Sequence, residues 1–159
     1  MPIQLEVKTE GFDTLARGLR NAPQSSADEL RAALTASLLV LEADQRQHVA
    51  QDTRRLLGSI HSEIRGEGTS LTGRVGPSTR YAFYVEYGRR RGKPPPVSAI
   101  AGWARRHGRN PFIVARTIGR RGTRPQPFVT PSLRRQRRMI DRIFARVGYR
   151  VIGRIVGGR

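Results

Sequence analysis

Few residues of this chain could carry nucleophilic or metal chemistry, and none has a spacing that favours it. Ser59, His61 and Asp52 could be assembled into a Ser-His-Asp set, but a nucleophilic serine needs a recognisable strained turn and none surrounds Ser59. Cysteine is absent, the three histidines lack metal-ligand spacing, and the carboxylates are not clustered as a Mg²⁺-dependent nuclease requires. We therefore expect no enzymatic activity, no metal and no cofactor.

The most suggestive side chains are aromatic, acidic and basic, and they gather in Val75–Arg91, which reads VGPSTRYAFYVEYGRRR. This stretch holds three of the four tyrosines and one carboxylate, Glu86, which Arg89–Arg91 follows. Such a carboxylate is expected to pair with an arginine, within the chain or across a subunit boundary. The aromatic side chains are expected to lie mostly in the core, because large rings usually supply buried area.

The sequence of this stretch is compatible with two local structures, a strand and a short helix. We expect a chain reversal at Gly76-Pro77, because glycine tolerates positive φ and proline fixes its own φ. After it, alternating residues over Tyr81–Tyr87 fit a strand, whereas a spacing of three and four residues fits a short helix that Gly88 ends. Either structure would hold an aromatic cluster beside a single acid.

The charge of the chain is strongly asymmetric. Residues 1–86 carry 10 Lys/Arg and 11 Asp/Glu, whereas residues 87–159 carry 20 Lys/Arg and one acid, and the net charge is +18. This asymmetry predicts an acidic partner for the second half, either nucleic acid or an acidic protein surface. No apolar run approaches the ~18 residues of a membrane span, and no secretory signal is present, so we expect no contact with a membrane.

The elements before the aromatic stretch are predicted from periodicity. Residues 3–7 alternate as a half-buried strand, and residues 15–19 fit a short helix. Ser26–Glu29 is a capping-box pattern, and a long core helix should follow to about His48 or Gln51. The core face of this helix is formed by Leu30, Leu34, Leu38 and Leu41. Residues 60–75 should then form an antiparallel hairpin with a glycine-containing turn.

The elements after the aromatic stretch are predicted to be helical. Residues 89–126 form a basic insertion with two short helices, one over 100–106 capped by Ser98 and one over 112–118 ended by Gly119. Thr130-Pro131 should start a C-terminal helix that Gly148 ends, with a last strand or short helix beyond it. Basic residues near the N-terminus of a helix interact unfavourably with the helix dipole, so the arginines at the start of this helix do not serve its stability. We interpret them as contacts with partners: Arg134, Arg135, Arg137, Arg138 and Arg142.

Together these elements predict an α+β fold in a single domain over residues 1–159. A small antiparallel sheet packs against the long core helix, with the basic insertion and the C-terminal helix added to it.

Three pieces of the sequence carry a resemblance to a known family. They are DTRRLLGSI at Asp52–Ile60, VGPSTRYAFYVEYG at Val75–Gly88 and PQPFVTPSL at Pro125–Leu133. In this order they resemble the motifs of the tail-completion or head–tail joining proteins of long-tailed bacteriophages, a family of tail components. Arg54 stands where that family usually has glycine. The resemblance implies an α+β domain that forms a closed ring of six or twelve copies around the DNA channel.

The function that we expect is therefore structural: a virion protein of the phage neck, made in the host cytoplasm, that connects the tail to the DNA-filled head. Its expected partners are the portal or connector, head-completion, tail-terminator and tail-tube proteins, with weak contact to packaged DNA. The alternative is a basic nucleic-acid-binding module. Against it, the sequence has no helix-turn-helix spacing, RNA-recognition motif or basic zipper.

The residues expected at interfaces come from the aromatic stretch, the basic insertion and the start of the C-terminal helix. They are Tyr81, Tyr84, Glu86, Arg89, Arg90, Arg91, Trp103, Arg105, Arg106, Arg120, Arg121, Arg124 and Phe128.

Overall fold

The computed structural model describes residues 5–7, 24–50, 52, 54–68 and 70–157. The expected short helix at residues 15–19 and the first residues of the expected N-terminal strand lie outside this part. The described elements, in chain order, are β1 (Leu5–Val7), α2 (Gln24–His48), α3 (Arg55–Gly58), β2 (Ile60–Glu67), β3 (Ser70–Pro77), α4 (Ala82–Tyr87), α5 (Val97–Arg106), α6 (Pro111–Arg121) and α7 (Val129–Gly157). The expected α+β class, with a small antiparallel sheet against a long core helix, is confirmed.

The sheet has the order β1-β3-β2 and both pairs are antiparallel. The predicted hairpin is confirmed: β2 and β3 pair from Ile60 opposite Pro77 to Glu67 opposite Ser70. The predicted reversal at Gly76-Pro77 is wrong, because both residues are still paired in β3 and the turn follows at residues 80–81. Proline is tolerated here because it stands at the end of its strand, where a missing amide donor costs little.

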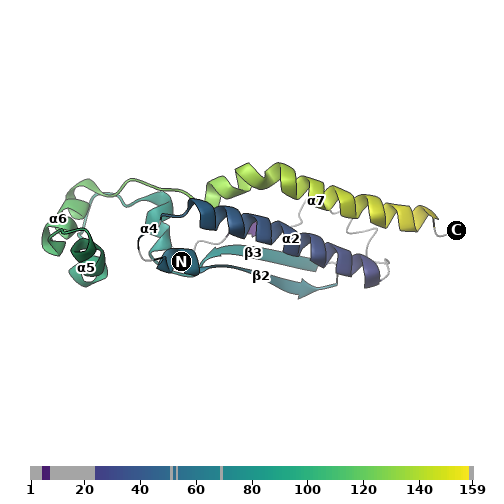
Figure 1. The fold of residues 1–159 in the computed structure, drawn as a ribbon, viewed down its shortest axis with the longest axis horizontal. Helices are drawn as coiled ribbons and strands as arrows, with labels where there is room; N and C mark the ends of the chain where they lie inside the picture. The colour runs from purple at the N-terminus through teal and green to yellow at the C-terminus, as the bar shows by residue number, and fades with distance from the viewer. Residues whose placement is uncertain (1–4, 8–23, 51, 53, 69, 158–159) are drawn as a thin grey trace.

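Helix α2 forms the middle layer of the molecule, between the sheet on one side and α7 on the other (Figure 1). Its leucines lie against the sheet as predicted, and Leu34, Leu38 and Leu41 are buried with Leu71 and Val75 of β3. Gly73 makes this close packing possible, because a Cβ added there would lie 2.9 Å from methyl carbons of Leu34 and Leu38.

The start of α2 differs from the prediction. The helix begins at Gln24, so Ser26 lies inside its first turn and is buried instead of capping the helix at Glu29. Its end at His48 agrees with the prediction.

Helix α7 runs unbroken from Val129 to Gly157, so the predicted end at Gly148 is wrong. A glycine inside a helix costs only about 1 kcal/mol, and the apolar face continues beyond it. Val147 and Val151 are buried against Ala33 of α2 on either side of Gly148. Burial of a valine contributes about 1.5–3 kcal/mol, so packing against α2 outweighs the local preference of glycine.

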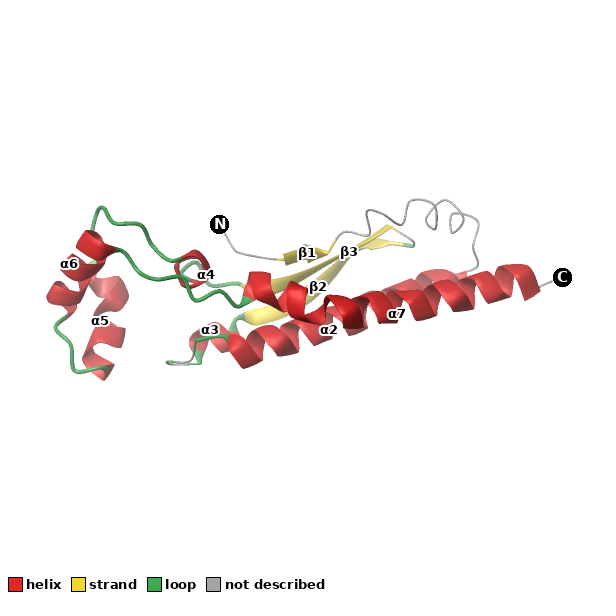
Figure 2. Ribbon diagram, turned by 90° about the horizontal axis from the view of Figure 1, so that it is seen from above, coloured by secondary structure: helices red, strands yellow, loops and turns green. Residues whose placement is uncertain are grey.

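Helices α5 and α6 lie beyond the end of the sheet, and two extended arms connect them to the rest of the molecule (Figure 2). Their bounds differ from the prediction. Helix α5 begins at Val97, directly after Pro96, so Ser98 lies inside the helix and does not cap it. Helix α6 is capped by the Asn110 side chain and passes through Gly119 to end before Gly122. A Cβ at Gly119 would lie 2.8 Å from the ring of Pro94, so this glycine serves the contact between the helix and the incoming arm.

Arg54 adopts the left-handed conformation, with φ of 56°, immediately before α3. Of the non-glycine residues that the structure describes, Arg54 alone has a positive φ. Glycine, which the resemblance to the phage family implies at this position, would adopt this conformation without the Cβ that costs roughly 1–2 kcal/mol.

Replacing Arg54 by glycine is expected to raise the free energy of unfolding by up to about 1 kcal/mol. The relief of the Cβ contact is partly offset by the greater backbone freedom of glycine in the unfolded chain. Urea unfolding of Arg54→Gly and Arg54→Ala measures this. Alanine keeps the Cβ and should leave stability near that of the wild type; equal stabilisation by both would trace the effect to the lost guanidinium.

Candidate assembly interface

Helix α4 points its small and acidic residues inward and its aromatic residues outward. Ala82 and Glu86 are buried, whereas Phe83, Tyr84 and Tyr87 are 43%, 48% and 56% exposed. The helical interpretation of this stretch is therefore confirmed, and the expectation that its aromatic side chains lie mostly in the core is wrong. The physical reason is that a helix of only 6 residues offers one inward face, and Ala82 and Glu86, four residues apart, occupy it.

The three exposed aromatic side chains form one cluster, which we call the aromatic patch (Phe83, Tyr84 and Tyr87). The centroid of the Phe83 ring lies 5.8 Å from that of Tyr84, nearly edge-on, and 5.0 Å from that of Tyr87. The Arg89 guanidinium lies 5.4 Å from the Tyr84 centroid, within the range of a cation–π contact. Aromatic and arginine side chains are enriched at protein interfaces, so the patch has the composition of a contact surface.

Among the described residues Glu86 pairs with no arginine, so the pairing predicted within the chain is wrong. Its carboxylate accepts hydrogen bonds from the backbone amides of Phe128, Val129 and Thr130, at 2.8, 2.9 and 2.8 Å. These are donors at the N-terminus of α7, which a carboxylate satisfies both by hydrogen bonding and by its charge. Burial would raise the pKa of Glu86, but the three amide bonds outweigh it and hold the pKa below the ordinary value.

Glu86 thus caps a helix that begins more than forty residues later, and it ties α4 to α7. Phe128 is fully buried beside Leu56, Ile60 and Ala82. Neither the Glu86 nor the Phe128 side chain reaches the surface of the single chain, at 1% and 0% exposed, so the structure gives neither an exposed group for the contact with a partner that the sequence predicted. Their role in the site is to fix the position of the helix that carries the aromatic patch.

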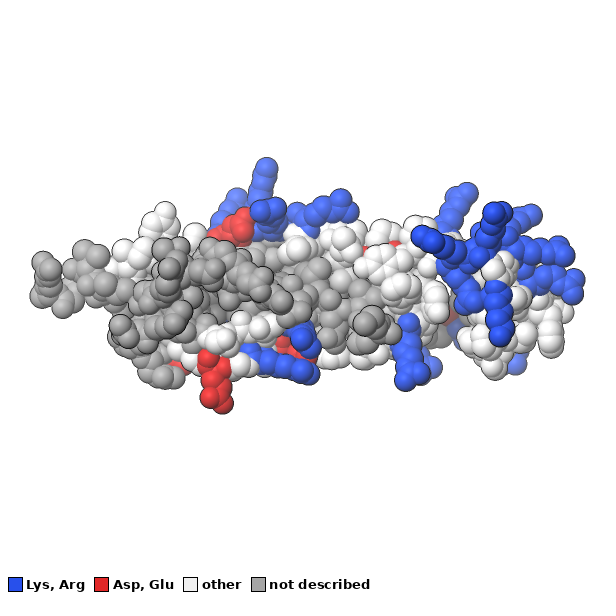
Figure 3. Space-filling view, turned by 180° about the vertical axis from the view of Figure 1, so that it is seen from behind, with Lys and Arg blue, Asp and Glu red and all other residues white. Residues whose placement is uncertain are grey.

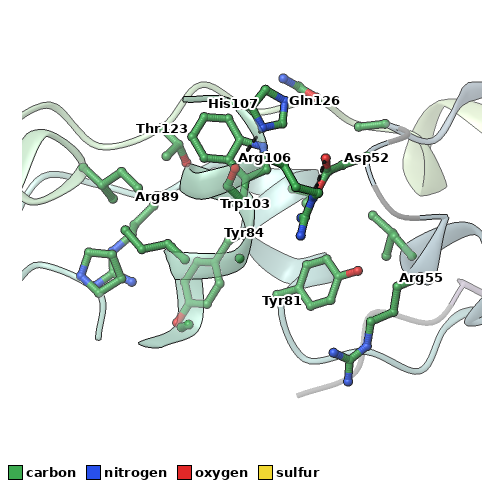
Figure 4. A pocket seen from close by; sticks show the side chains of 18 of the residues that line it. Asp52, Arg55, Tyr81, Tyr84, Arg89, Trp103, Arg106, His107, Thr123 and Gln126 are labelled. Carbon is green, nitrogen blue, oxygen red and sulfur yellow. Dashed lines mark hydrogen bonds and ion pairs between the residues drawn. The ribbon is translucent and has the colours of Figure 1, made fainter. Parts of the chain in front are cut away.

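A groove with a volume of about 1030 Å³ separates α4 from α5. Figure 4 shows Tyr81 and Tyr84 on one side of it and Trp103 of α5 on the other. Trp103 stacks on His107, with 4.3 Å between the ring centroids, and it is still 42% exposed. These half-exposed rings give the groove an apolar lining.

Across this groove, Arg106 of α5 binds the carboxylate of Asp52, which precedes α3. The hydrogen bond from Arg106 lowers the pKa of Asp52. Of the expected interface arginines, Arg106 therefore already has a partner within the chain.

The two arms that carry α5 and α6 are joined to each other by backbone hydrogen bonds. The amide of Arg89 donates to the carbonyl of Thr123 at 3.2 Å, and the amide of Thr123 donates back to Arg89 at 2.9 Å. Gly88 has φ of 70°, and a Cβ there would lie 2.5 Å from the Thr123 carbonyl oxygen. Gly88 therefore both ends α4 and allows the arms to approach.

Residues 89–126, which we call the basic tip, gather the positive charge at one end of the molecule (Figure 3). The segment carries eleven Lys/Arg and no Asp/Glu. The structure places seven of the predicted interface arginines on its surface: Arg90, Arg91, Arg105, Arg106, Arg120, Arg121 and Arg124. Arg89 is half-buried, and its guanidinium donates to the carbonyl of Lys93 at 2.7 Å.

The sequence interpretation missed two features of this surface. Phe112 and Ile113 of α6 are 70% and 65% exposed, and neither was among the residues expected at interfaces. Arg135, expected to contact a partner, instead binds Asp44 of α2 with its guanidinium, so it belongs to the packing of α7 on α2. Periodicity could have predicted the exposure of Ile113, because it lies on the side of the helix opposite the buried Ala115 and Gly119, whereas the exposure of Phe112 follows only from the tertiary structure.

The Ser59, His61 and Asp52 set is not brought together as a catalytic triad. Asp52 binds Arg106, and the Ser59 hydroxyl donates to the Leu56 carbonyl at 2.7 Å. His61 Nδ1 lies 3.0 Å from the backbone oxygen of Ser59 and not at its hydroxyl. Within the described part of the chain, no helix combines the length and apolarity that a membrane span needs.

Comparison with known proteins gives one match. The family model described as "Bacteriophage HK97-gp10, putative tail-component" matches residues 13–88, just under half of the chain. No curated protein and no solved structure matches the chain. The resemblance inferred from sequence is confirmed for this segment, which includes the aromatic patch, whereas Pro125–Leu133 lies outside it. The match indicates a structural tail protein of the virion that contacts other phage structural proteins.

Proposed function

We propose that this chain, whose residues 13–88 match a family of bacteriophage tail components, is a ring-forming structural protein of the phage neck. In this proposal six or twelve copies close around the DNA channel and connect the tail to the DNA-filled head. The neighbouring layers would be portal or connector, head-completion, tail-terminator or tail-tube proteins. The role is structural and not catalytic.

The observation that carries the proposal is the aromatic patch on α4. Its three aromatic side chains are between 43% and 56% exposed, and they lie inside the segment that matches the tail-component family. Monomeric proteins rarely expose contiguous aromatic clusters, because burying such a surface is favourable. The patch is also held rigidly, since Glu86 on the opposite side of α4 is bonded to the start of α7. A rigid patch loses little conformational entropy when it docks.

A closed ring needs two different faces on each subunit. The aromatic patch can supply one of them. Exposed apolar side chains on α2 and α7 are available for the other, namely Leu39, Met139, Tyr149 and Ile152. The elongated shape, with the α4 end and the α7 C-terminal end far apart (Figure 1), suits subunits that contact neighbours on two sides.

The proposal predicts that the purified protein forms closed rings that depend on the aromatic patch. Phe83→Ser combined with Tyr87→Ser should weaken self-association by about a thousandfold, because two aromatic anchors at about 2 kcal/mol each account for roughly 4 kcal/mol. Mass photometry and electron microscopy measure the effect. Phe112→Ser, which removes a ring that is 70% exposed on α6, is the matched control and should leave the rings intact.

The alternative, a nucleic-acid-binding module, predicts the opposite result. A monomer at micromolar concentration that binds duplex DNA tightly, with affinity falling steeply as salt rises, would overturn the ring proposal. The eleven cations of the basic tip would supply the electrostatic attraction that such DNA binding requires.

A further inference from the structure

The outward face of α6 carries apolar and basic residues in one continuous stripe. Phe112, Ile113, Arg116, Thr117, Arg120 and Arg121 recur at intervals of four, and all six are exposed. Ala115 and Gly119, on the side of the helix opposite the row Ile113, Thr117 and Arg121, are buried. The stripe therefore has two exposed apolar side chains at the N-terminal end of the helix and three arginines toward its C-terminal end.

This face is held in a fixed position before any partner arrives. The Asn110 side chain accepts a hydrogen bond from the Phe112 amide at 2.9 Å and caps the helix. At the other end, the amide of Gly92 in the incoming arm donates to the Gly119 carbonyl at 2.7 Å. Because both ends of α6 are tied down, its outward stripe is preorganised for binding.

A second copy of this chain cannot neutralise the basic tip. The net charge is +18 per copy, so every closed assembly of identical copies multiplies the positive charge. The sequence has twelve carboxylates, and six that lie in the described part are already bonded within the chain: Glu29, Glu42, Asp44, Asp52, Glu63 and Glu86. The six others could not balance the eleven cations of the tip. The partner of this surface must bring its own negative charge.

The apolar end of the stripe distinguishes between two kinds of acidic partner. A phosphate backbone attracts arginine but offers no burial to Phe112 and Ile113, which are 70% and 65% exposed. An acidic protein surface with an apolar pocket satisfies both halves of the stripe, since arginine pairs with carboxylates and apolar anchors fill pockets.

We propose that the outer face of α6 docks onto an acidic protein surface of a different virion component, with Phe112 and Ile113 in an apolar pocket and Arg116, Arg120 and Arg121 on its carboxylates. This inference rests on the proposed function, because it assigns the aromatic patch to contacts between copies and the basic tip to a foreign partner.

Photo-cross-linking in assembled phage particles tests this division. p-Benzoylphenylalanine is placed at Phe112 in one variant and at Phe83 in a second, and the cross-linked peptides are identified by mass spectrometry. From position 112 we expect a peptide of another virion protein that is rich in Asp and Glu. From position 83 we expect a peptide of a second copy of this chain.

The charge requirement is tested in the variant labelled at position 112. Adding Arg116→Ser and Arg120→Ser should lower the yield of the cross-link by about tenfold or more, because each lost pair with a carboxylate weakens binding. Arg65→Ser on β2 combined with Arg146→Ser on α7, which removes the same charge at two exposed positions outside the basic tip, should leave it unchanged.

The outcomes separate the two proposals. A cross-link from position 112 to a second copy, to DNA or to a peptide without excess acid overturns the inference about α6, whatever position 83 shows. An acidic foreign peptide at position 112 without self-cross-linking at position 83 overturns the ring proposal and supports the docking surface. Absence of the protein from the particles overturns both.

Discussion

Replacing Glu86 by alanine is expected to lower the free energy of unfolding by about 3–5 kcal/mol. The change removes the acceptor of three backbone amides at the start of α7 and leaves those donors without partners in the interior. A buried donor left unsatisfied costs about 1–3 kcal/mol. Because whole domains are stable by only about 5–15 kcal/mol, the loss is a large fraction of the total.

The effect of Glu86 also depends on pH, and the sign follows from its lowered pKa. The three amide bonds outweigh the opposing effect of burial and lower the folded-state pKa below the unfolded value, which is about 4.3. Its contribution is therefore fully present above the unfolded pKa and is lost as pH falls through the folded pKa. The stability difference between the wild type and Glu86→Gln should be largest above about pH 5 and should shrink below about pH 4.

Urea unfolding between pH 3 and pH 7, followed by circular dichroism, measures both effects. Glu63→Ala is the control, because its carboxylate is at the surface and paired with Arg65, and such pairs contribute about 0–1 kcal/mol. If Glu86→Ala unfolded at the wild-type urea concentration, the role of Glu86 as the cap of α7 would be wrong.

Replacing Arg135 by alanine is the second change with a large expected effect, and it should lower the free energy of unfolding by about 3–5 kcal/mol. Asp44 of α2 is only 5% exposed and receives Arg135 Nε at 3.0 Å and Nη2 at 2.6 Å, both at Oδ2. Gln136 donates to the other oxygen at 2.7 Å. Burial would raise the pKa of Asp44, but the bonds from Arg135 and Gln136 lower it. Removing the arginine leaves a buried carboxylate without its cation, which is the costly case.

Two further variants make this result specific. Arg134→Ala removes the adjacent, exposed arginine and should change stability by less than about 0.5 kcal/mol. The double variant Asp44→Ala with Arg135→Ala should be more stable than Arg135→Ala alone, because it no longer buries an uncompensated charge. If Arg134→Ala and Arg135→Ala were equally mild, the pair would not hold α7 on α2. Thermal or urea unfolding of the four proteins gives the answer.

The contacts of Glu86 with α7 and of Arg135 with Asp44 could not be predicted from the sequence. Arg134 and Arg135 are neighbours of the same type, and no local pattern distinguishes the one that packs on α2. Their difference arises because α7 lies along α2 in a register that sets Arg135 opposite Asp44. Likewise, the acid and the aromatic side chains of Val75–Arg91 were recognisable as a special group, but their orientation was not. Once α4 turns Glu86 toward the amides of α7, the aromatic patch must face outward.

The amino-acid sequence by itself determined the leucine face of α2, the β2–β3 hairpin, the helical character of residues 100–106 and 112–118 and the concentration of charge in the second half. These follow from periodicity, from glycine and proline, and from composition, which act over a few residues or need no structure at all. The tertiary structure decided the continuity of α7 through Gly148, the burial of Glu86 and Phe128, and the exposure of the aromatic patch. Each depends on contacts between residues far apart in the chain, and packing energies of several kcal/mol override local preferences of about 1 kcal/mol.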